Sequence, residues 1–434
     1  MTLIAFRGGT PLADEIELKA HLASLLRLEN IGALLGAGAS ASAGGSTMKA
    51  MWSDFLWMSP VEAGWLKANS FIAAAERVPA TPRPAHAPPL PPTVVPPPPV
   101  LPETPNIEVL ADKLEIAIVE WDRQGDALAD PAKKARAALL KAVLRAAKLK
   151  DELWSSPAAD IAGDGLDTHR SLLQKLTSAR QPGQAPPWIF TTNYDLAIEW
   201  AAESVDIQVI NGFLGLHNRR FSPQSFDLGL RNIQARGEAR FGAYNIYLAK
   251  LHGSLTWKEF DHDLFEVPAS QAWPDLQGFL DGSKPDLGYR VLPRAAKYLQ
   301  TIGYVLGELF RRFAEFLARP QAALIIAGYG FGDEHINRLI RSALLNPTLQ
   351  VVIYLPEFTG DPTSAALPPT VRRLLALQNP RLTIVGGGSD AYLSKLVEHL
   401  PNPVIYDENL SDLERRLRPR HPDPVDADDG LGGE

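Results

Sequence analysis

Residues 31–46 read IGALLGAGASASAGGS, an apolar run that leads directly into a turn of small residues. The apolar part, Ile31–Leu35, is short and bounded by glycine, which is typical of a buried strand. A turn without large side chains lets the backbone approach a ligand closely, and the first N–H groups of a following helix attract an anion. The stretch therefore predicts a strand–turn–helix unit that is either a cradle for a diphosphate or a tight turn without a ligand.

Three more sharp turns follow in the chain, and each comes after an apolar run. They read TNYD at Thr192–Asp195, LHGS at Leu251–Ser254 and GYGFGD at Gly328–Asp333. Apolar runs alternate with helical patterns around these turns, which indicates a parallel sheet covered by helices on both faces. Because ligands of such sheets bind at the carboxyl ends of the strands, we expect the four turns to gather around one site.

The alternation predicts an α/β fold: a Rossmann-like, doubly wound parallel sheet with a helical insertion and a proline-rich linker. We expect residues 1–60 and 169–405 to form the Rossmann-like domain and residues 61–168 to form the insertion. Thirteen of the 27 residues at 79–105 are proline, which lacks the N–H that helices and sheets need. This segment is expected to be an extended linker, with recruitment of a partner as the alternative. Residues 406–434 are expected to be a largely disordered tail.

The composition excludes several classes of protein. The chain of 434 residues has no cysteine, which rules out disulfides, a thiol nucleophile and cysteine-ligated zinc. No His, Asp or Glu spacing matches a metal site, so we expect no metal. A formal net charge of −7 argues against direct nucleic-acid binding. The chain begins without a basic stretch and an apolar core and has no long apolar window, so a cytoplasmic protein without a membrane segment is expected.

The first turn differs from two common nucleotide-binding motifs. Ala41 stands where the G-x-G-x-x-G pattern of dehydrogenases has its third glycine, and no acidic residue ends a clear second strand about twenty positions later. The chain has no G-x-x-x-x-G-K-[ST] loop either. The sequence therefore argues against an ordinary dehydrogenase and against a nucleoside triphosphatase.

Two residues of the later turns are candidates for chemistry. The amide of Asn193 offers both a donor and an acceptor, which suits a ribose hydroxyl, a carboxamide or a water; a left-handed turn residue is the alternative. The imidazole of His252 can accept a proton from a sugar hydroxyl or from water; a structural histidine is the alternative. Asp195 is also in position to cap the helix that we expect from Asp195 to Glu203.

Taken together, the four turns resemble the sirtuin family, and especially its divergent bacterial branch of NAD-cleaving antiphage defence effectors. The matching blocks are GAGAS with a later glycine, TTNYD, LHG and GYG, in the family's order. The resemblance implies that Asn193 positions the nicotinamide ribose and an attacking water, and that His252 is a general base toward a ribose hydroxyl. It also implies that NAD is bound by Gly36, Ala37, Gly38, Ser40, Thr192, Asp195, Gly328, Tyr329, Gly330 and Asp333.

The chain departs from protein-deacylating sirtuins, which carry a four-cysteine zinc module and a Pro-x-Phe-Arg block where this chain has Gly45-Ser46-Thr47. The expected activity is therefore NAD+ hydrolysis to nicotinamide and ADP-ribose by an abortive-infection effector. A non-catalytic sensor of NAD or ADP-ribose and an NAD-dependent protein deacylase are the alternatives. The resemblance suggests control through a homo-oligomer or through a partner such as a HerA-type ATPase or a short Argonaute.

Overall fold

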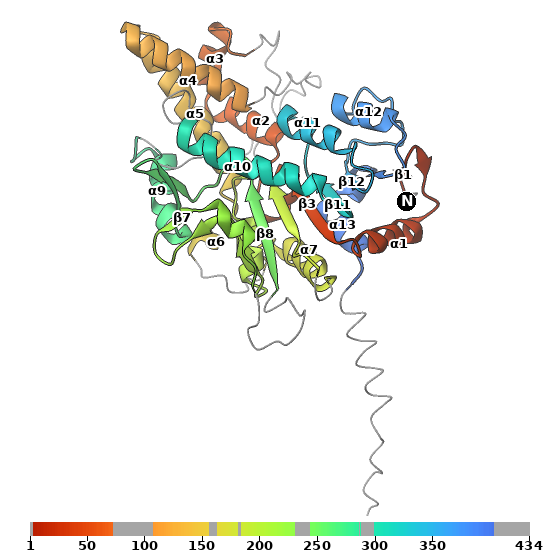
Figure 1. Cartoon of the computed structure of the whole chain (residues 1–434). Coiled ribbons are helices and arrows are strands. Elements are labelled where there is room, and N and C mark those ends of the chain that lie inside the picture. The colour runs from red at the N-terminus through yellow and green to blue at the C-terminus, as the bar shows by residue number, and fades with distance from the viewer. Residues whose placement is uncertain are drawn as a thin grey trace, which may run out of the picture.

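A computed structural model describes residues 3–72, 107–155, 163–180, 184–230, 244–285, 287 and 299–402 (Figure 1). The proline-rich linker predicted at 79–105 and the tail predicted at 406–434 lie outside the described residues.

The main element is a nine-stranded sheet in the order β2-β1-β13-β12-β11-β3-β4-β8-β5. Seven strands are parallel, and the short β1 and β2 add antiparallel pairs at one edge. The sheet is therefore largely parallel, as predicted. The strands are β1 (Ala5–Arg7), β2 (Thr10–Pro11), β3 (Asn30–Leu35), β4 (Trp188–Thr191), β5 (Gln208–Ile210), β8 (Asn245–Lys250), β11 (Ala322–Ala327), β12 (Gln350–Tyr354) and β13 (Leu382–Val385).

The chain reverses its direction of travel across the sheet beside β3. From β3 it passes to β4 and to the edge strand β5, returns to β8 between them, and then crosses to β11, β12 and β13 on the other side of β3. The boundary between β3 and β11 is therefore the point where strand order switches, which is the usual ligand-binding position of a doubly wound sheet.

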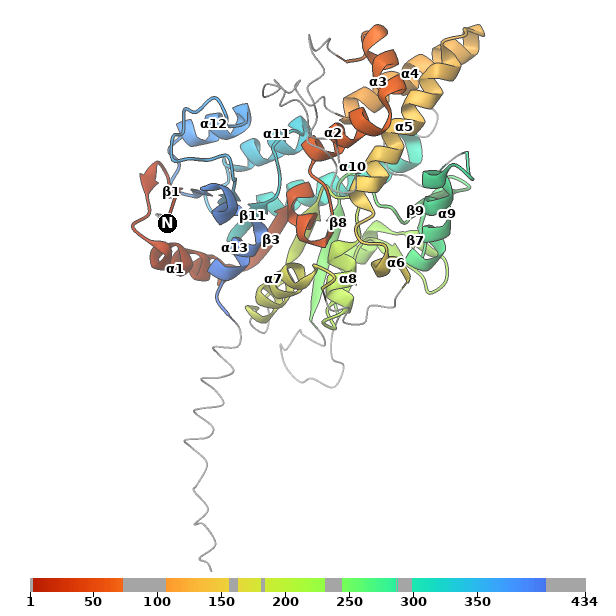
Figure 2. The same ribbon diagram turned by 180° about the vertical axis from the view of Figure 1, so that it is seen from behind.

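The central strands are buried on both faces, so successive side chains enter two different cores. On β3, Ile31, Ala33 and Leu35 join one core, whereas Leu34 joins the other. One face is covered by α1 (Glu15–Leu25), α7 (Asp167–Ser178), α8 (Ala197–Glu203) and α13 (Leu393–His399), which Figure 2 shows from behind. The other face is covered by α10 (Leu299–Ala318), α11 (Glu334–Ala343) and α12 (Pro369–Ala376). This two-sided cover confirms the predicted α/β fold class.

Helices occupy most of the described chain between β3 and β4. A short 3-10 helix, η1 (Ala37–Ala43), follows β3 directly. After it come α2 (Met48–Met58), α3 (Pro60–Ala68), α4 (Ile107–Gln124), α5 (Ala129–Ala147) and α6 (Glu152–Ser155). Their buried faces, such as Ala135 and Leu139 on α5, continue the core on the α7 and α8 side. In both views α4 and α5 project from one end of the molecule (Figures 1 and 2).

A second, antiparallel sheet was not predicted from the sequence. Its order is β6-β7-β10-β9, with strands β6 (Phe213–Leu214), β7 (Arg219–Phe221), β9 (Trp257–Phe260) and β10 (Asp263–Glu266). It is accompanied by the 3-10 helix η2 (Pro223–Asp227) and by α9 (Ala269–Asp281). Strands of two to four residues are too short to show a period-two pattern, so periodicity cannot detect them. The buried Glu266 accepts hydrogen bonds from Asn211 (2.8 and 2.9 Å) and pairs with Arg219.

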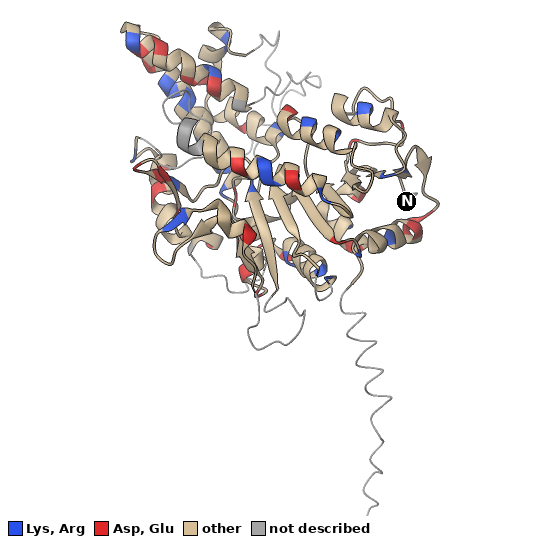
Figure 3. Cartoon of the chain, in the orientation of Figure 1, with Lys and Arg blue, Asp and Glu red and all other residues tan. Residues whose placement is uncertain are grey.

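Charged residues lie mainly on the helices, while the strands of the main sheet carry few of them (Figure 3). Positive and negative residues are interspersed over α4, α5 and α10 (Figure 3). Among the helices of the described part of the chain, none is both long and apolar enough to span a lipid bilayer.

Two buried histidines predict that the fold loses stability in acid. Burial lowers the pKa of His21 on α1 and of His169 on α7 to about 4. An unfolded histidine titrates near 6.5, so the unfolded chain binds more protons between about pH 6.5 and 4. The free energy of unfolding should therefore fall as the pH decreases through this window, by on the order of 1–3 kcal/mol per histidine. Urea denaturation at pH 7 and pH 5 measures this loss.

The double variant His21→Asn/His169→Gln is the control for other titrating groups. It should show a smaller loss of unfolding free energy between pH 7 and pH 5 than the wild type does. An equal loss in both proteins would contradict the assignment to these two histidines.

Candidate active site

The four predicted turns begin at the same edge of the main sheet. The neighbouring strands β11, β3, β4 and β8 are parallel, and their last residues are in register: Ala327 pairs with Leu35, Leu35 with Thr191, and Thr191 with Lys250. The next residue of each strand therefore starts a turn at the same height. Segments separated by nearly the whole length of the domain thus become neighbours at the carboxyl ends of the strands.

The first and fourth turns are in direct backbone contact. The N–H of Gly36 donates to the carbonyl of Ala327 (3.1 Å), and the N–H of Gly38 donates to the carbonyl of Gly328 (3.0 Å). A methyl group at Gly36 would come within 2.5 Å of the Gly328 carbonyl oxygen. Glycine is therefore required here by packing between the two turns, whether or not a ligand binds. Ala37 begins η1, and its N–H has no backbone acceptor among the described residues.

Asn193 points its amide toward the first turn. Its Nδ2 donates to the carbonyl of Gly36 (3.1 Å) and to Oγ of Ser40 (2.9 Å). The side chain is 9% exposed, and within the described part of the chain its buried Oδ1 has no hydrogen-bond partner. The backbone of Asn193 is outside the left-handed region, so the turn itself does not call for asparagine. A buried acceptor without a donor is costly, and it indicates a place for a water or a ligand group.

Asp195 supports Asn193 from inside the protein. Its Oδ1 accepts the N–H of Ala197 (3.0 Å), and the side chains of Ser40 and Asn193 interact with its carboxylate. Burial raises the pKa of Asp195, while Lys250 and these polar neighbours oppose the rise. The sequence indicated Asp195 as the N-cap of α8, but the N-cap residue is Leu196. With its carboxylate engaged by these groups, Asp195 orients Asn193 and Ser40.

Thr192 begins the second turn and is anchored through its backbone. Its N–H donates to the carbonyl of Leu35 (3.1 Å), and the hydroxyl of Thr191 donates to the same oxygen (2.9 Å). The second turn is therefore hydrogen-bonded to the end of β3, the strand that leads to Gly36.

His252 lies two residues beyond β8, as Asn193 lies two residues beyond the neighbouring strand β4, and the last residues of these strands are paired. Its Nε2 is 2.7 Å from Oδ2 of Asp333 in the fourth turn. Burial raises the pKa of Asp333, but the hydrogen bond and charge of His252 and two backbone N–H groups lower it more, so the carboxyl stays below its usual pKa. The ring of Tyr194 is 6.4 Å from the imidazole, between centroids.

The fourth turn is braced by its own side chains. The hydroxyl of Tyr329 is 3.1 Å from the carbonyl oxygen of Asp333 and 3.1 Å from Oδ1 of Asn337. Nδ2 of Asn337 donates to the carbonyl of Phe331 (2.8 Å), whose backbone is left-handed. Gly330 is exposed, and a methyl group there would meet no atom within 4 Å. Packing therefore does not explain glycine at this position, and the backbone is open to an approaching ligand.

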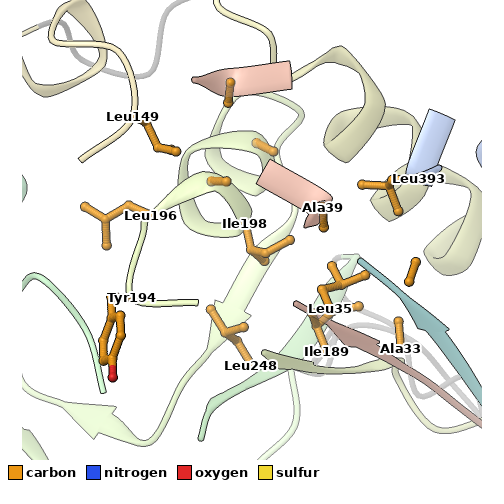
Figure 4. Close-up of a cluster of buried hydrophobic side chains, with 14 of the residues drawn as sticks. Ala33, Leu35, Ala39, Leu149, Ile189, Tyr194, Leu196, Ile198, Leu248 and Leu393 are labelled. Atoms are coloured by element: carbon orange, nitrogen blue, oxygen red, sulfur yellow. The ribbon is translucent and has the colours of Figure 1, made fainter. Parts of the chain in front are cut away.

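Apolar side chains hold the turns on the sheet. Figure 4 shows Leu35, Ile189 and Leu248 from β3, β4 and β8 gathered in one layer with Ala39 of η1 and Ile198 of α8. All of these side chains are buried. The polar residues of the site therefore stand on a close-packed base, which limits their movement.

The comparison with protein families identifies the region that carries three of these turns. The family model described as a SIR2-like domain matches residues 187–367. The chain carries a SIR2-like domain. No curated protein matches the chain.

The match confirms the resemblance to sirtuins over residues 187–367, a region that resembles a domain of NAD-dependent enzymes. This region includes Asn193, His252 and Asp333, while the Gly36 turn lies before the matched residues and joins the domain through β3 and β11. Within the described residues, no group of three or more His, Asp or Glu side chains is arranged to hold a metal ion.

Lys250 is a residue of the SIR2-like domain that sequence reasoning missed. It is 2% exposed, and its Nζ contacts Glu199 Oε1 (2.8 Å) and the carbonyl oxygens of Tyr194 (3.4 Å) and Asp195. The ammonium thus holds the second turn from below and faces the carboxylate of Asp195. A lysine that ends the apolar strand NIYLAK directly before LHG was the available signal, because buried lysines need partners.

The contact between the two glycine turns predicts unequal effects of two similar substitutions. Gly36→Ala should lower the free energy of unfolding by about 1–3 kcal/mol, because the new methyl group overlaps the Gly328 backbone. Gly330→Ala should stay within about 1 kcal/mol of the wild type, because its methyl group meets open space. Urea denaturation compares the two. Equal stability of both variants would contradict the packing explanation.

Removing the buried ammonium should destabilise the SIR2-like domain. Lys250→Met leaves Glu199 and Asp195 without their cation, so the free energy of unfolding should fall by about 3–5 kcal/mol. The exposed Lys134→Met is the matched control and should change stability by about 0.5 kcal/mol or less. Chemical denaturation of both variants makes the measurement, and a Lys250→Met protein as stable as the control would refute the role of Lys250.

Proposed function

We propose that this protein hydrolyses NAD+ to nicotinamide and ADP-ribose. Two observations carry the proposal: Asn193 has a buried Oδ1 without a partner among the described residues, and His252 pairs with Asp333 just beyond the neighbouring strand of the SIR2-like domain. An acceptor and a paired imidazole are the groups needed to position a water and to take a proton from a hydroxyl group.

The reaction needs little more than these groups and a binding surface. The bond between C1′ of the ribose and the nicotinamide nitrogen breaks, and nicotinamide leaves with the electron pair. Water adds to C1′ and gives up a proton. The transition state resembles an oxocarbenium ion, so the enzyme must orient the dinucleotide and stabilise positive charge on the sugar.

The residues of the first and fourth turns fit the diphosphate end of such a substrate. The N–H of Ala37 at the start of η1 and the open backbone at Gly330 are groups that can approach an anion without side-chain obstruction. In this proposal Gly36, Gly38 and Gly328 shape the turns, and Asp195, Ser40 and Thr192 hold Asn193 and its strand end in place.

Hydrolysis is favoured over protein deacylation because the chain has no cysteine for the zinc module of deacylating sirtuins. An unregulated NAD hydrolase would deplete its own cell. We therefore include in the proposal a role as an antiphage defence effector, held in check by self-association or by a partner such as a HerA-type ATPase or a short Argonaute.

Nicotinamide release from NAD+ by the purified protein tests the proposal. Asn193→Ala and His252→Ala should each lower the rate by about 100-fold or more, because each removes a group that acts on the reacting ribose or on water. The exposed His335→Ala, on the adjacent helix α11, is the matched control and should keep the wild-type rate.

The outcomes separate the alternatives. Tight NAD binding without release would indicate a sensor, and turnover only with an acylated peptide would indicate a deacylase. Undiminished release by His252→Ala with a native circular-dichroism spectrum would refute the role proposed for His252.

A further inference from the structure

The two carboxylate oxygens of Asp333 have different partners. Oδ2 lies 2.7 Å from Nε2 of His252, while Oδ1 accepts the backbone N–H groups of His335 (2.7 Å) and Ile336 (3.3 Å) at the start of α11. Asp333 is thus both the N-cap of a helix and the partner of the candidate base. Neither role was visible in the sequence, which predicted only a contact between Asp333 and NAD.

The helix cap determines how Asp333 faces the histidine. Two backbone donors hold Oδ1, and the carbonyl oxygen of Asp333 is within 3.1 Å of the Tyr329 hydroxyl, so the residue is restrained on both sides. Both members of the pair are largely buried, with 14% and 12% of their side chains exposed. Oδ2 is therefore presented to His252 in one orientation.

The charge on Asp333 determines which nitrogen carries the proton. Its hydrogen bonds keep the pKa of the carboxyl below the usual value, despite the opposing effect of burial. An ionised carboxylate can only accept, so Nε2 must donate to it. In the neutral imidazole the second nitrogen, Nδ1, then carries the lone pair.

We infer that Asp333 is a positioning residue that holds His252 as the Nε2–H tautomer and thereby makes Nδ1 its proton-accepting atom. Its consequence for catalysis rests on the proposed NAD+ hydrolysis, whereas the tautomer itself does not. The inference also predicts that the ring is oriented by the start of α11, an element far along the chain from the turn that carries His252.

The test uses Asp333→Asn in the full chain. Asparagine has one carboxamide oxygen, and the helix cap requires it, so its NH2 group would face His252. Nε2 must then accept, and the ring proton should move to Nδ1. Ring nitrogen chemical shifts of protein labelled with 15N-histidine report the tautomer without NAD present, and His252→Gln identifies the signal of His252 by its absence.

The wild type should show the proton on Nε2, and Asp333→Asn should show it on Nδ1. A wild-type proton on Nδ1, or the same Nε2–H tautomer in Asp333→Asn, would overturn the inference. Asp14→Asn alters the N-cap of α1, which is far along the chain from His252, and should leave the His252 signals unchanged.

A kinetic comparison separates positioning from a general loss of structure. For NAD+ cleavage, Asp333→Asn should lower kcat by about 100-fold or more while KM changes by about threefold or less, because the base is altered and the helix cap is retained. A fall in kcat that is matched by an equally large fall in the free energy of unfolding of Asp333→Asn would contradict a positioning role for Asp333. If the wild type cleaves no NAD+ but shows the Nε2–H tautomer, the proposed function fails and the assignment of Asp333 stands.

Discussion

The candidate site depends on the contact between two backbone segments, the Gly36 turn and the Gly328 turn. They meet where strand order reverses, and their hydrogen bonds leave no room for a Cβ atom. This contact fixes the height at which η1 starts, and Asn193 is hydrogen-bonded to η1 and to Gly36. The position of the amide thus follows from a constraint on the main chain, and the side chains of Asp195 and Lys250 reinforce it from below.

Much of the sheet was predictable because buried parallel strands have a strong local signal. The strand expected at Ile31–Leu35 is β3, which the structure extends by one residue to Asn30. The second sheet was missed because its strands are too short for periodicity. Helix α8 begins at Ala197 and not at Asp195, whose carboxylate accepts the N–H of Ala197 from just before the helix.

The site was predictable in outline and not in its contacts. Parallel strands must end at one edge, so four turns after four strands implied one location. The contacts within that location could not be predicted, because His252 and Asp333 are 81 residues apart and no local pattern links them. Gly36, Gly38 and Gly328 were expected to serve a ligand, and the packing of the two turns against each other already requires small residues there. What the sequence indicated correctly was where polar groups gather, and only the packing shows which of them are already engaged.

The pairing of β3 with β11 also bears on when the site can assemble. Asn30 lies beside Ala322, 292 residues later in the chain, and Asp333 follows eleven residues after that. The ribosome synthesises the amino-terminal half first, and non-local strand pairing such as that of β3 with β11 is slow to form. A nascent chain therefore contains Asn193 and His252 before it contains the Gly328 turn and Asp333. The complete site can form only after translation has passed the Gly328 turn.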